Sequence, residues 1–327
     1  MSNKTSRVLL VILCVLLSLV LLFGVFCVVI LEKYRSYQDL MNFTENPSIT
    51  EHPLYKEMRR KGLLIEDDPD IINILLIGQD AREGQGRQRS DSMILLTVNV
   101  NTNTLTMTSF MRDMYVEIPD HDNNKLNACY QMGGAYLLDL CLLKNFGIVV
   151  DANIEIDFEG FMQVIDTVGG VDIELSQKEA EWLNVKGNWG VSNTAGTWNL
   201  KAGKNHLTGD QALAYCRDRF SDGTYDFGRT ERQQKVLTAL MNKCKKMSLS
   251  ELDEMMRTVL PMITTDMDSK QMDQYVTNVL PLLPKLSVNK VRVPGDDAYY
   301  NDTVGGMSVL MPDLDKCKAL LKSALNR

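Results

Sequence analysis

Residues 8–31 form an uninterrupted apolar run, and this run restricts the fold more than any other feature of the chain. Its 24 residues carry no charge, and only Ser18 and Gly24 are weakly polar or small interruptions. As a helix the run extends about 36 Å at ~1.5 Å per residue, enough to cross a ~30 Å hydrocarbon layer. The apolar core of a cleaved signal peptide is shorter, ~7–15 residues, and precedes an Ala-x-Ala site that is missing here. The run therefore predicts one uncleaved transmembrane helix.

The basic residues beside the run are evenly divided, two on each side, so charge bias alone leaves the orientation open. Most of the chain follows the run, which favours a single-pass protein of the cell membrane with a cytoplasmic tail at 1–7 and the rest outside. Residues 32–70 contain prolines and an acidic stretch, and we expect a juxtamembrane spacer there. Residues 71–327 are expected to form one extracytoplasmic domain.

Apolar segments of strand length alternate with helical segments beyond residue 70. Runs rich in β-branched residues predict strands at 71–77, 93–100, 105–110, 153–158, 171–175 and 288–293. Apolar periodicity and end signals predict helices at 125–144, 161–168, 177–183, 208–216, 228–247, 250–262 and 268–280, and from residue 313 onward. Strands interleaved with helices predict a layered α/β/α domain around a central mixed sheet, an α/β fold.

Arginine is concentrated in two short windows of an acidic protein. The net charge of −7 and the pI near 5.2 argue against nucleic-acid binding, which depends mainly on basic side chains that neutralise phosphates. Eight of the fifteen arginines nevertheless fall in two windows, namely Arg82, Arg87, Arg89 and Arg112, and Arg217, Arg219, Arg229 and Arg232. Guanidinium groups match phosphate oxygens bidentately and stay charged when partly buried. The windows predict a local phosphate site, and two solvated surface patches are the alternative.

Two aspartates lie where predicted strands end. Asp80 comes directly after the first strand and Asp91 directly before the second, so both carboxylates should lie at one edge of the sheet. Hard oxygen ligands from neighbouring strand ends suit a magnesium ion whose other ligands are water and phosphate. Aspartates also close turns and cap helices, so the spacing alone does not distinguish a magnesium site from ordinary turns. Arg112 follows the third strand and should bring a cation to this edge.

A second group of polar residues opens the helix predicted near 228–247. Asp226 precedes it, and Arg229 and Gln233 lie one helical turn apart, with Arg232 adjacent. The unpaired N–H groups of a helix amino terminus already favour an anion. We expect these side chains to add to that preference.

The cysteines give no metal-binding pattern. Two of the seven lie in the apolar run, and the other five show neither a Cys-x-x-Cys pair nor Cys/His spacing, which argues against a zinc site. An odd number leaves at least one free thiol. Buried thiols are the default interpretation, and one disulfide among them stays open.

Ordered motifs between about residues 73 and 246 resemble the LytR-CpsA-Psr family of single-pass, outward-facing phosphotransferases of Gram-positive cell walls. The matching stretches are ILLIGQDAR, RQRSDSMILLTVN, TSFMRDMYVEIP, KLNACYQMGG, DFEGFMQVIDTVGGVDIEL, LTGDQALAYCRDR and DFGRTERQQ. Seven ordered blocks behind a membrane anchor make the match specific. The chain departs from the family where Phe110-Met111 replaces the usual Ile-Pro before Arg112-Asp113.

The resemblance implies transfer of a glycopolymer with its phosphate from a polyprenyl-pyrophosphate lipid to peptidoglycan or another wall acceptor, forming a phosphodiester. It implies Mg²⁺, or Mn²⁺ in its place, held by Asp80 and Asp91. The implied pyrophosphate-binding residues are Arg82, Arg89, Arg112, Lys125, Arg217, Arg219, Arg229 and Gln233. The implied catalytic residues are Arg89, Arg112, Arg217, Arg219 and Asp226, the last to orient an arginine or help activate the acceptor hydroxyl.

The polyprenyl tail is expected in an apolar groove of the domain. Met132 and residues 137–143 are candidates to line this groove, although an ordinary role in the core is the stronger alternative for them.

Two other functions remain open. Water as acceptor would make the protein a hydrolase of lipid pyrophosphates. A non-catalytic protein that binds lipid-linked polymer, or regulates, is the alternative outside the enzymes, although an acidic extracytoplasmic domain fits DNA regulation poorly.

Overall fold

The computed structural model describes residues 36–65, 68, 70–79, 86–185, 198–282 and 285–325. The predicted membrane-spanning run at 8–31 lies outside these residues. Within the described part, no helix combines the length and the apolar character that crossing a membrane requires. Residues 42–327 form one compact unit, separate from 1–41.

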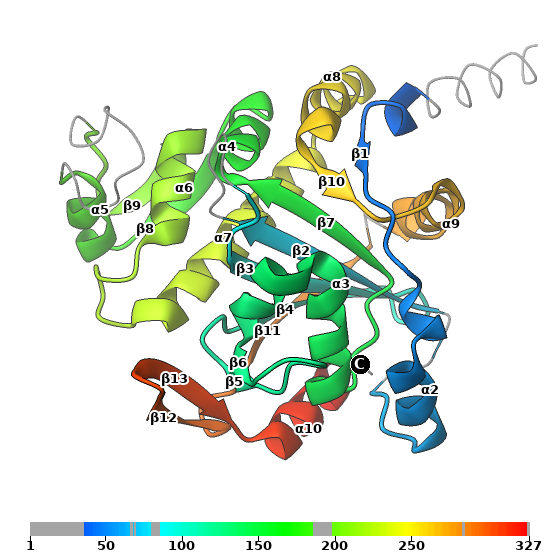
Figure 1. Cartoon of the computed structure of the whole chain (residues 1–327). Helices are drawn as coiled ribbons and strands as arrows, with labels where there is room; N and C mark the ends of the chain where they lie inside the picture. The colour runs from blue at the N-terminus through cyan, green and yellow to red at the C-terminus, as the bar shows by residue number, and fades with distance from the viewer. Residues whose placement is uncertain are drawn as a thin grey trace, which may run out of the picture. The chain divides into compact units, whose positions relative to one another are not determined.

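A seven-stranded sheet lies at the centre of this unit (Figure 1). Its order is β1 (Asn42–Phe43), β10 (Thr264–Thr265), β7 (Ala152–Asp157), β2 (Ile71–Gln79), β3 (Ser90–Asn99), β4 (Thr104–Phe110) and β11 (Ser287–Val293). Neighbours β2, β3 and β4 pair antiparallel, whereas β7 with β2 and β4 with β11 pair parallel. The sheet is therefore mixed, as predicted.

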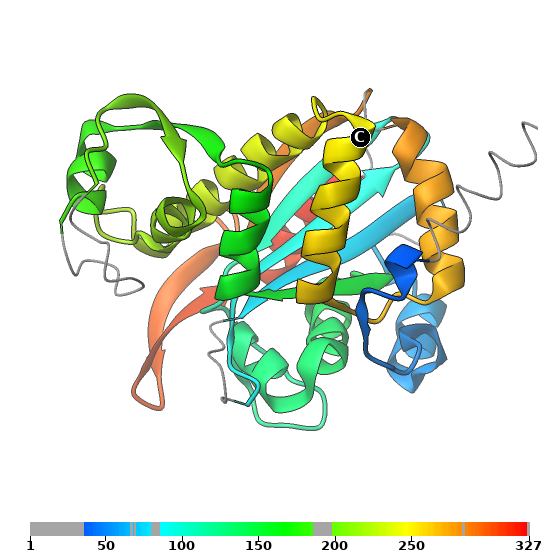
Figure 2. The same cartoon turned by 90° about the horizontal axis from the view of Figure 1, so that it is seen from above.

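Helices cover both faces of the sheet because the central strands carry apolar side chains on both faces. Leu75 and Leu95 pack into the core that includes α3 (Leu126–Phe146) and α10 (Leu314–Leu325). Ile94 and Val98 pack on the other face with α7 (Tyr225–Cys244) and α9 (Ser269–Val279). Figure 2 shows α4 (Phe158–Thr167), α8 (Leu249–Val259) and α9, in green, yellow and orange, across the strands. The predicted layered α/β/α arrangement is confirmed.

A smaller antiparallel pair flanks the main sheet. It consists of β8 (Val171–Leu175) and β9 (Gly203–Leu207) and packs with α5 (Gln177–Leu183) and α6 (Gly209–Arg217) around a second apolar core. Ser176 caps α5, and Glu179 returns its carboxylate to the Ser176 N–H, so the start of this helix is fixed locally. This subdomain delivers α6 to the side of the main sheet.

The segment expected to be a spacer at 32–70 is partly folded into the unit. Strand β1 joins the edge of the sheet, and α2 (Pro53–Arg60) packs Tyr55 and Met58 against Leu140 and Leu143. Leu54, Tyr55 and Met58 give this eight-residue helix one apolar face, which the spacer interpretation overlooked. The domain thus begins before residue 71.

Several short elements complete the unit. The 3₁₀ turns are Ile49–Glu51, Leu260–Met262 and Leu280–Leu282, and a small pair joins β5 (Tyr115–Val116) to β6 (Asn124–Lys125). The carboxyl-terminal region adds a hairpin, β12 (Tyr299–Val304) and β13 (Met307–Pro312), which the sequence did not predict. Apolar and polar residues alternate only weakly along its two strands, so the two-residue periodicity of a strand is hard to recognise in the sequence.

Candidate active site

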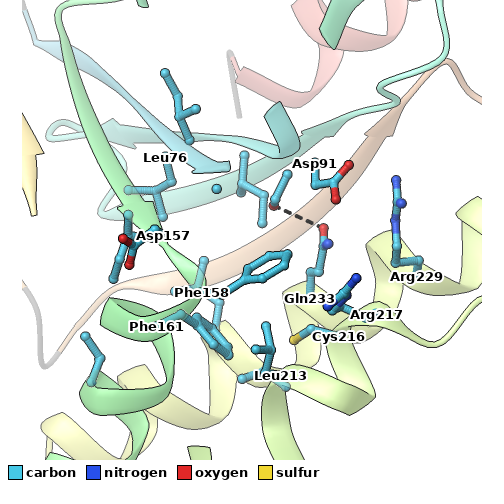
Figure 3. A pocket seen from close by; sticks show the side chains of 18 of the residues that line it. Leu76, Asp91, Asp157, Phe158, Phe161, Leu213, Cys216, Arg217, Arg229 and Gln233 are labelled. Carbon is cyan, nitrogen blue, oxygen red and sulfur yellow. Dashed lines mark hydrogen bonds between the residues drawn. The ribbon is translucent and has the colours of Figure 1, made fainter. Parts of the chain in front are cut away.

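A cavity of about 450 Å³ lies between the sheet and helices α4, α6 and α7. Its apolar lining comes from these elements and includes Leu76, Ile94, Ile154, Phe161, Val164, Leu213, Val236 and Leu240. Its polar lining includes Asp91, Arg112, Arg217, Arg219, Arg229 and Gln233. In Figure 3 Asp91, Gln233, Arg217 and Arg229 gather on one side, and Leu76, Phe161 and Leu213 lie on the other. The cavity is thus amphipathic, with a cationic part beside an apolar part.

Asp226 is the carboxylate around which the arginines converge. Its oxygens lie 2.7 Å from Arg219 Nη2, 2.9 Å from Arg229 Nη2 and 3.7 Å from Arg112 Nη2. Arg112 also pairs with Asp91 at the start of β3. Guanidinium groups from after β4, from the loop after α6 and from α7 therefore meet at one carboxylate. Arg112 of the first arginine window therefore meets Arg219 and Arg229 of the second, as predicted for these three residues.

The start of α7 places Asp226 and Arg229 at this point. Asp226 lies in the first turn of the helix, where a negative charge is favourable, and Arg229 follows three residues later. Gly228 between them has no room for a side chain, because a Cβ there would lie 1.9 Å from Thr224 Oγ1. The Asp-Phe-Gly-Arg stretch therefore combines two charged groups with one steric requirement.

The cationic part of the cavity is largely buried and contains N–H donors that make no hydrogen bond within the described residues. Arg229 is only 5% exposed; burial lowers its pKa to about 10, and repulsion from Arg112 acts in the same direction, so the side chain is still cationic at neutral pH. Burial alone would lower the pKa of Arg112, but the nearby carboxylates of Asp91, Asp226 and Asp113 outweigh it and raise this pKa. Within the described part of the chain, the Nε atoms of Arg219 and Arg229 make no hydrogen bond, and that of Arg112 has only an ion pair with Asp113 at 3.5 Å. Such buried, unused donors suit an incoming anion.

Comparison with known proteins agrees with this geometry. A model of the LytR_cpsA_psr family matches residues 37–325. The chain belongs to this family. The predicted resemblance is therefore confirmed, and it extends through the carboxyl-terminal region.

Individual members of the LytR_cpsA_psr family are similar over most of the chain. The polyisoprenyl-teichoic acid–peptidoglycan teichoic acid transferase TagU of Bacillus mycoides (strain KBAB4) is 32% identical over 227 residues, 69% of each chain. The protein of that name from Oceanobacillus iheyensis is 34% identical over 218 residues, 64% of this chain and 63% of its own. The structure of TagT bound to LI-WTA has a TM-score of 0.63 at 27% identity and covers 80% of this chain and 92% of that one. YwtF (TagT) with bound octaprenyl pyrophosphate lipid has a TM-score of 0.60 at 25% identity, with the same coverage.

Not every residue that the family resemblance implied lines the cavity. Arg89 is exposed and donates its Nε–H to Gln131 Oε1 on α3 at 3.2 Å. Lys125 pairs with Asp113 at 2.6 Å and so reaches Arg112 only indirectly. Asp80 and Arg82 lie outside the described residues.

Sequence reasoning missed several cavity residues, among them Phe158 and Ser92. Phe158, at the start of α4, stacks under Arg217 with the guanidinium carbon 4.7 Å from the ring centre. Ser92 donates its hydroxyl to Gln233 Oε1 at 3.1 Å. Ser92 follows Asp91 directly and Phe158 ends a predicted strand, so the strand-end argument that found Asp91 extends to both.

The apolar residues suggested for the lipid groove lie elsewhere. Leu137, Leu138 and Leu142 are buried in the core on the opposite face of the sheet from the cavity, and Met132 is exposed. The core alternative was the right one for residues 137–143, because α3 covers the face that the cavity does not use.

Arg232 makes its contacts outside the cavity, unlike Arg229 on the same helix. It is 1% exposed, and its Nε atom lies 2.9 Å from Glu179 Oε1. It also donates to the Asp218 carbonyl oxygen at 3.1 Å and pairs with Asp222. The expectation that it adds to the anion site is wrong, because Arg232 faces the α5 subdomain and holds the loop after α6.

Of the two aspartates predicted to hold a metal ion, Asp91 lies within the described residues. The described residues hold no cluster of three or more His, Cys, Asp or Glu side chains able to bind a metal ion, and Asp80 lies outside them. Asp91 offers a carboxylate at the cavity, and the buried Gln79 Oε1 of the adjacent strand accepts no hydrogen bond from the described residues. Hard oxygen donors at two neighbouring strand ends fit a magnesium ion that shares its ligands with phosphate and water.

Proposed function

We propose that this protein transfers a glycopolymer, with its phosphate, from a polyprenyl-pyrophosphate carrier to a hydroxyl of peptidoglycan or another cell-wall acceptor. The observation that carries the proposal is the amphipathic cavity, because a polyprenyl pyrophosphate is itself an apolar chain joined to a dense anion. The relatives named as teichoic acid transferases, and the similar YwtF structure with octaprenyl pyrophosphate, support the same substrate class.

Transfer of this kind needs mainly positioning and positive charge. The acceptor hydroxyl attacks the phosphorus next to the glycopolymer and loses its proton to solvent water. A new P–O bond forms, the bond to the bridging oxygen breaks, and polyprenyl phosphate leaves. Arg112, Arg219 and Arg229 neutralise the diphosphate oxygens as charge shifts to the leaving group, and Arg217 approaches from its stack on Phe158. Asp226 holds three of these guanidinium groups in place rather than acting as the base.

The proposal includes a bound magnesium ion and a location outside the cell membrane. Asp91 and Asp80 would hold the ion together with the side-chain oxygen of Gln79. The ion would add positive charge beside the diphosphate. The apolar run at 8–31 would anchor the protein by a single helix, which keeps the cavity close to the lipid carrier.

Replacing Asp91 with asparagine should lower turnover on a polyprenyl-pyrophosphate glycan by about 10²–10³-fold, comparable to removing one group that stabilises transition-state charge. The neutral amide binds magnesium weakly, so the magnesium concentration for half-maximal rate should also rise. Asp172→Asn, an exposed aspartate paired with Lys204, serves as the matched control and should change neither quantity. Full turnover of Asp91→Asn with an unchanged magnesium profile would contradict the assignment.

Filling the apolar part of the cavity should separate lipid binding from diphosphate binding. We expect Val164→Trp on α4 to weaken binding of a long-chain polyprenyl pyrophosphate at least tenfold, since the indole occupies space that the chain needs, while inorganic pyrophosphate binds as before. Val185→Trp places the same side chain at an exposed position and is the control. Equal affinity of both variants for the lipid, measured by fluorescence titration, would exclude the cavity as the chain's binding site.

The reaction itself is tested by analysing its products. Full-length protein in detergent is incubated with a polyprenyl-pyrophosphate glycan, magnesium and peptidoglycan fragments. Mass spectrometry should find a sugar joined to the fragment through a phosphodiester. Free phosphorylated glycan as the sole product would assign a hydrolase, and an intact lipid after hours would assign a binding protein.

A further inference from the structure

Helix α3 is broken in its middle by two glycines. Gly133 has φ −138° and ψ 16°, and Gly134 has φ 70° and ψ −160°, which are not helical values. Cys129 lies before the break and Cys141 after it. In an unbroken helix, positions twelve residues apart are separated by about 18 Å along the axis. Their sulfur atoms are instead 2.6 Å apart, so the break folds the second half of α3 back beside the first.

This contact is distinct from those of the other thiols in the described part of the chain. Cys317 approaches only the Ala298 carbonyl oxygen, and Cys244 only the sulfur of Met255, each at nearly 4 Å. Cys129 and Cys141 are both fully buried in the main core and lie against each other. A sulfur–sulfur approach of this kind requires little movement to become a bond of normal length, ~2.0 Å.

We propose that Cys129 and Cys141 form a disulfide that joins the two halves of α3 across the Gly133–Gly134 break. The two thiols lose two protons and two electrons to an external disulfide, by exchange through a mixed disulfide, and the external disulfide becomes two thiols. The inference relies on the proposed location outside the membrane, where such bonds persist.

The bond should form while the chain is folding rather than afterwards. Burial raises the pKa of Cys141, and the adjacent Cys129 raises it further. The thiolate is the reactive form, so a buried, protonated thiol exchanges slowly. Once α3 has packed, neither sulfur is accessible to an oxidant or a reductant.

The first half of α3 and its break lie beside the backbone of Arg112, which gives the bond a structural role. The Asn127 N–H donates to the Arg112 carbonyl oxygen at 3.2 Å, and the Tyr130 hydroxyl donates to Glu155 at 2.6 Å. Arg87 lies over the Tyr130 ring and also against Gly134, where a Cβ would be 3.0 Å from its guanidinium carbon. Fixing the halves together therefore fixes the backbone beside Arg112.

Peptide mapping tests the bond directly, because residues 126–144 form one tryptic peptide that contains both cysteines. Full-length protein is exported, extracted from membranes with an alkylating reagent present, and digested without reductant. The expected peptide carries no alkyl group and is lighter by two hydrogen atoms, whereas Cys216, Cys244 and Cys317 are alkylated after denaturation. If both cysteines of this peptide are alkylated, and are alkylated again in a separate sample that is refolded in a glutathione redox buffer before the reagent is added, the inference is wrong.

Thermal unfolding provides a second measurement. Protein refolded in dithiothreitol should melt about 5 °C below the oxidised protein, the scale expected for opening a loop of this size in a domain of this length. Cys129→Ala should abolish the difference, and Cys317→Ala, another buried thiol, should preserve it. An equal reductant effect in both variants would overturn the inference. Transfer activity of the reduced protein would leave the proposed function standing, so the two ideas fail separately.

Discussion

Replacing Arg229 with alanine should lower the rate of glycopolymer transfer by about 10²–10³-fold, the usual cost of losing one donor that stabilises developing negative charge. Arg229 is almost fully buried at the cavity and retains an unused Nε donor among the described residues. The loss should appear in kcat as well as in kcat/KM, because the interaction strengthens as charge develops on the leaving phosphate. Steady-state kinetics with a polyprenyl-pyrophosphate glycan measures it.

The conservative variant sharpens this test. Arg229→Lys keeps the charge but lacks the planar fork, so we expect it to recover only part of the lost rate. Arg257→Ala removes a half-exposed arginine that pairs with Asp253 on α8, and it should leave kcat unchanged. Wild-type kinetics for Arg229→Ala, with folding verified by circular dichroism, would remove Arg229 from the mechanism.

Replacing Arg232 with methionine should instead destabilise the fold, lowering the free energy of unfolding by about 3–5 kcal/mol. The substitution leaves Asp218 and Glu179 as buried carboxylates without their cation, and the Asp218 carbonyl oxygen without a donor. Urea denaturation followed by circular dichroism gives the free energy.

Lys235→Met is the matched control for this variant. Lys235 pairs with Glu231 on the exposed side of the same helix, and loss of such a surface pair costs about 1 kcal/mol or less. If Arg232→Met unfolds at the wild-type urea concentration, the buried network does not stabilise the domain. Any activity lost by Arg232→Met should follow the fraction of unfolded protein, in contrast to Arg229→Ala.

These two arginines show what the sequence could predict about the site. Strand periodicity located Asp91 and Arg112 correctly, since strand ends at one sheet edge must lie close together. Helix periodicity placed Arg229 and Gln233 on one face, and both line the cavity. The partners of Arg232 belong to α5 and to the loop after α6, and no local pattern records a contact between such distant segments.

The fold was predictable to a similar extent. The central strands and the long helices have strong periodicity, and the structure contains them close to the expected positions. The break in α3 had a visible signal, because two adjacent glycines are costly inside a helix. Helix α2 and the β12–β13 hairpin were missed although each has a local signal. These signals are the apolar face of Leu54, Tyr55 and Met58, and the Gly305-Gly306 turn between two strands that pair with each other.

The arginines around Asp226 have a consequence for selectivity. Each guanidinium already has a resident counter-ion, so an incoming anion must compete with a carboxylate that is covalently tethered and therefore always present. A singly charged solute gains too little from that exchange to remain bound. A diphosphate offers several oxygens and a larger charge to the whole group at once, so the protein can stay folded and unoccupied in a salt-rich environment until its lipid arrives.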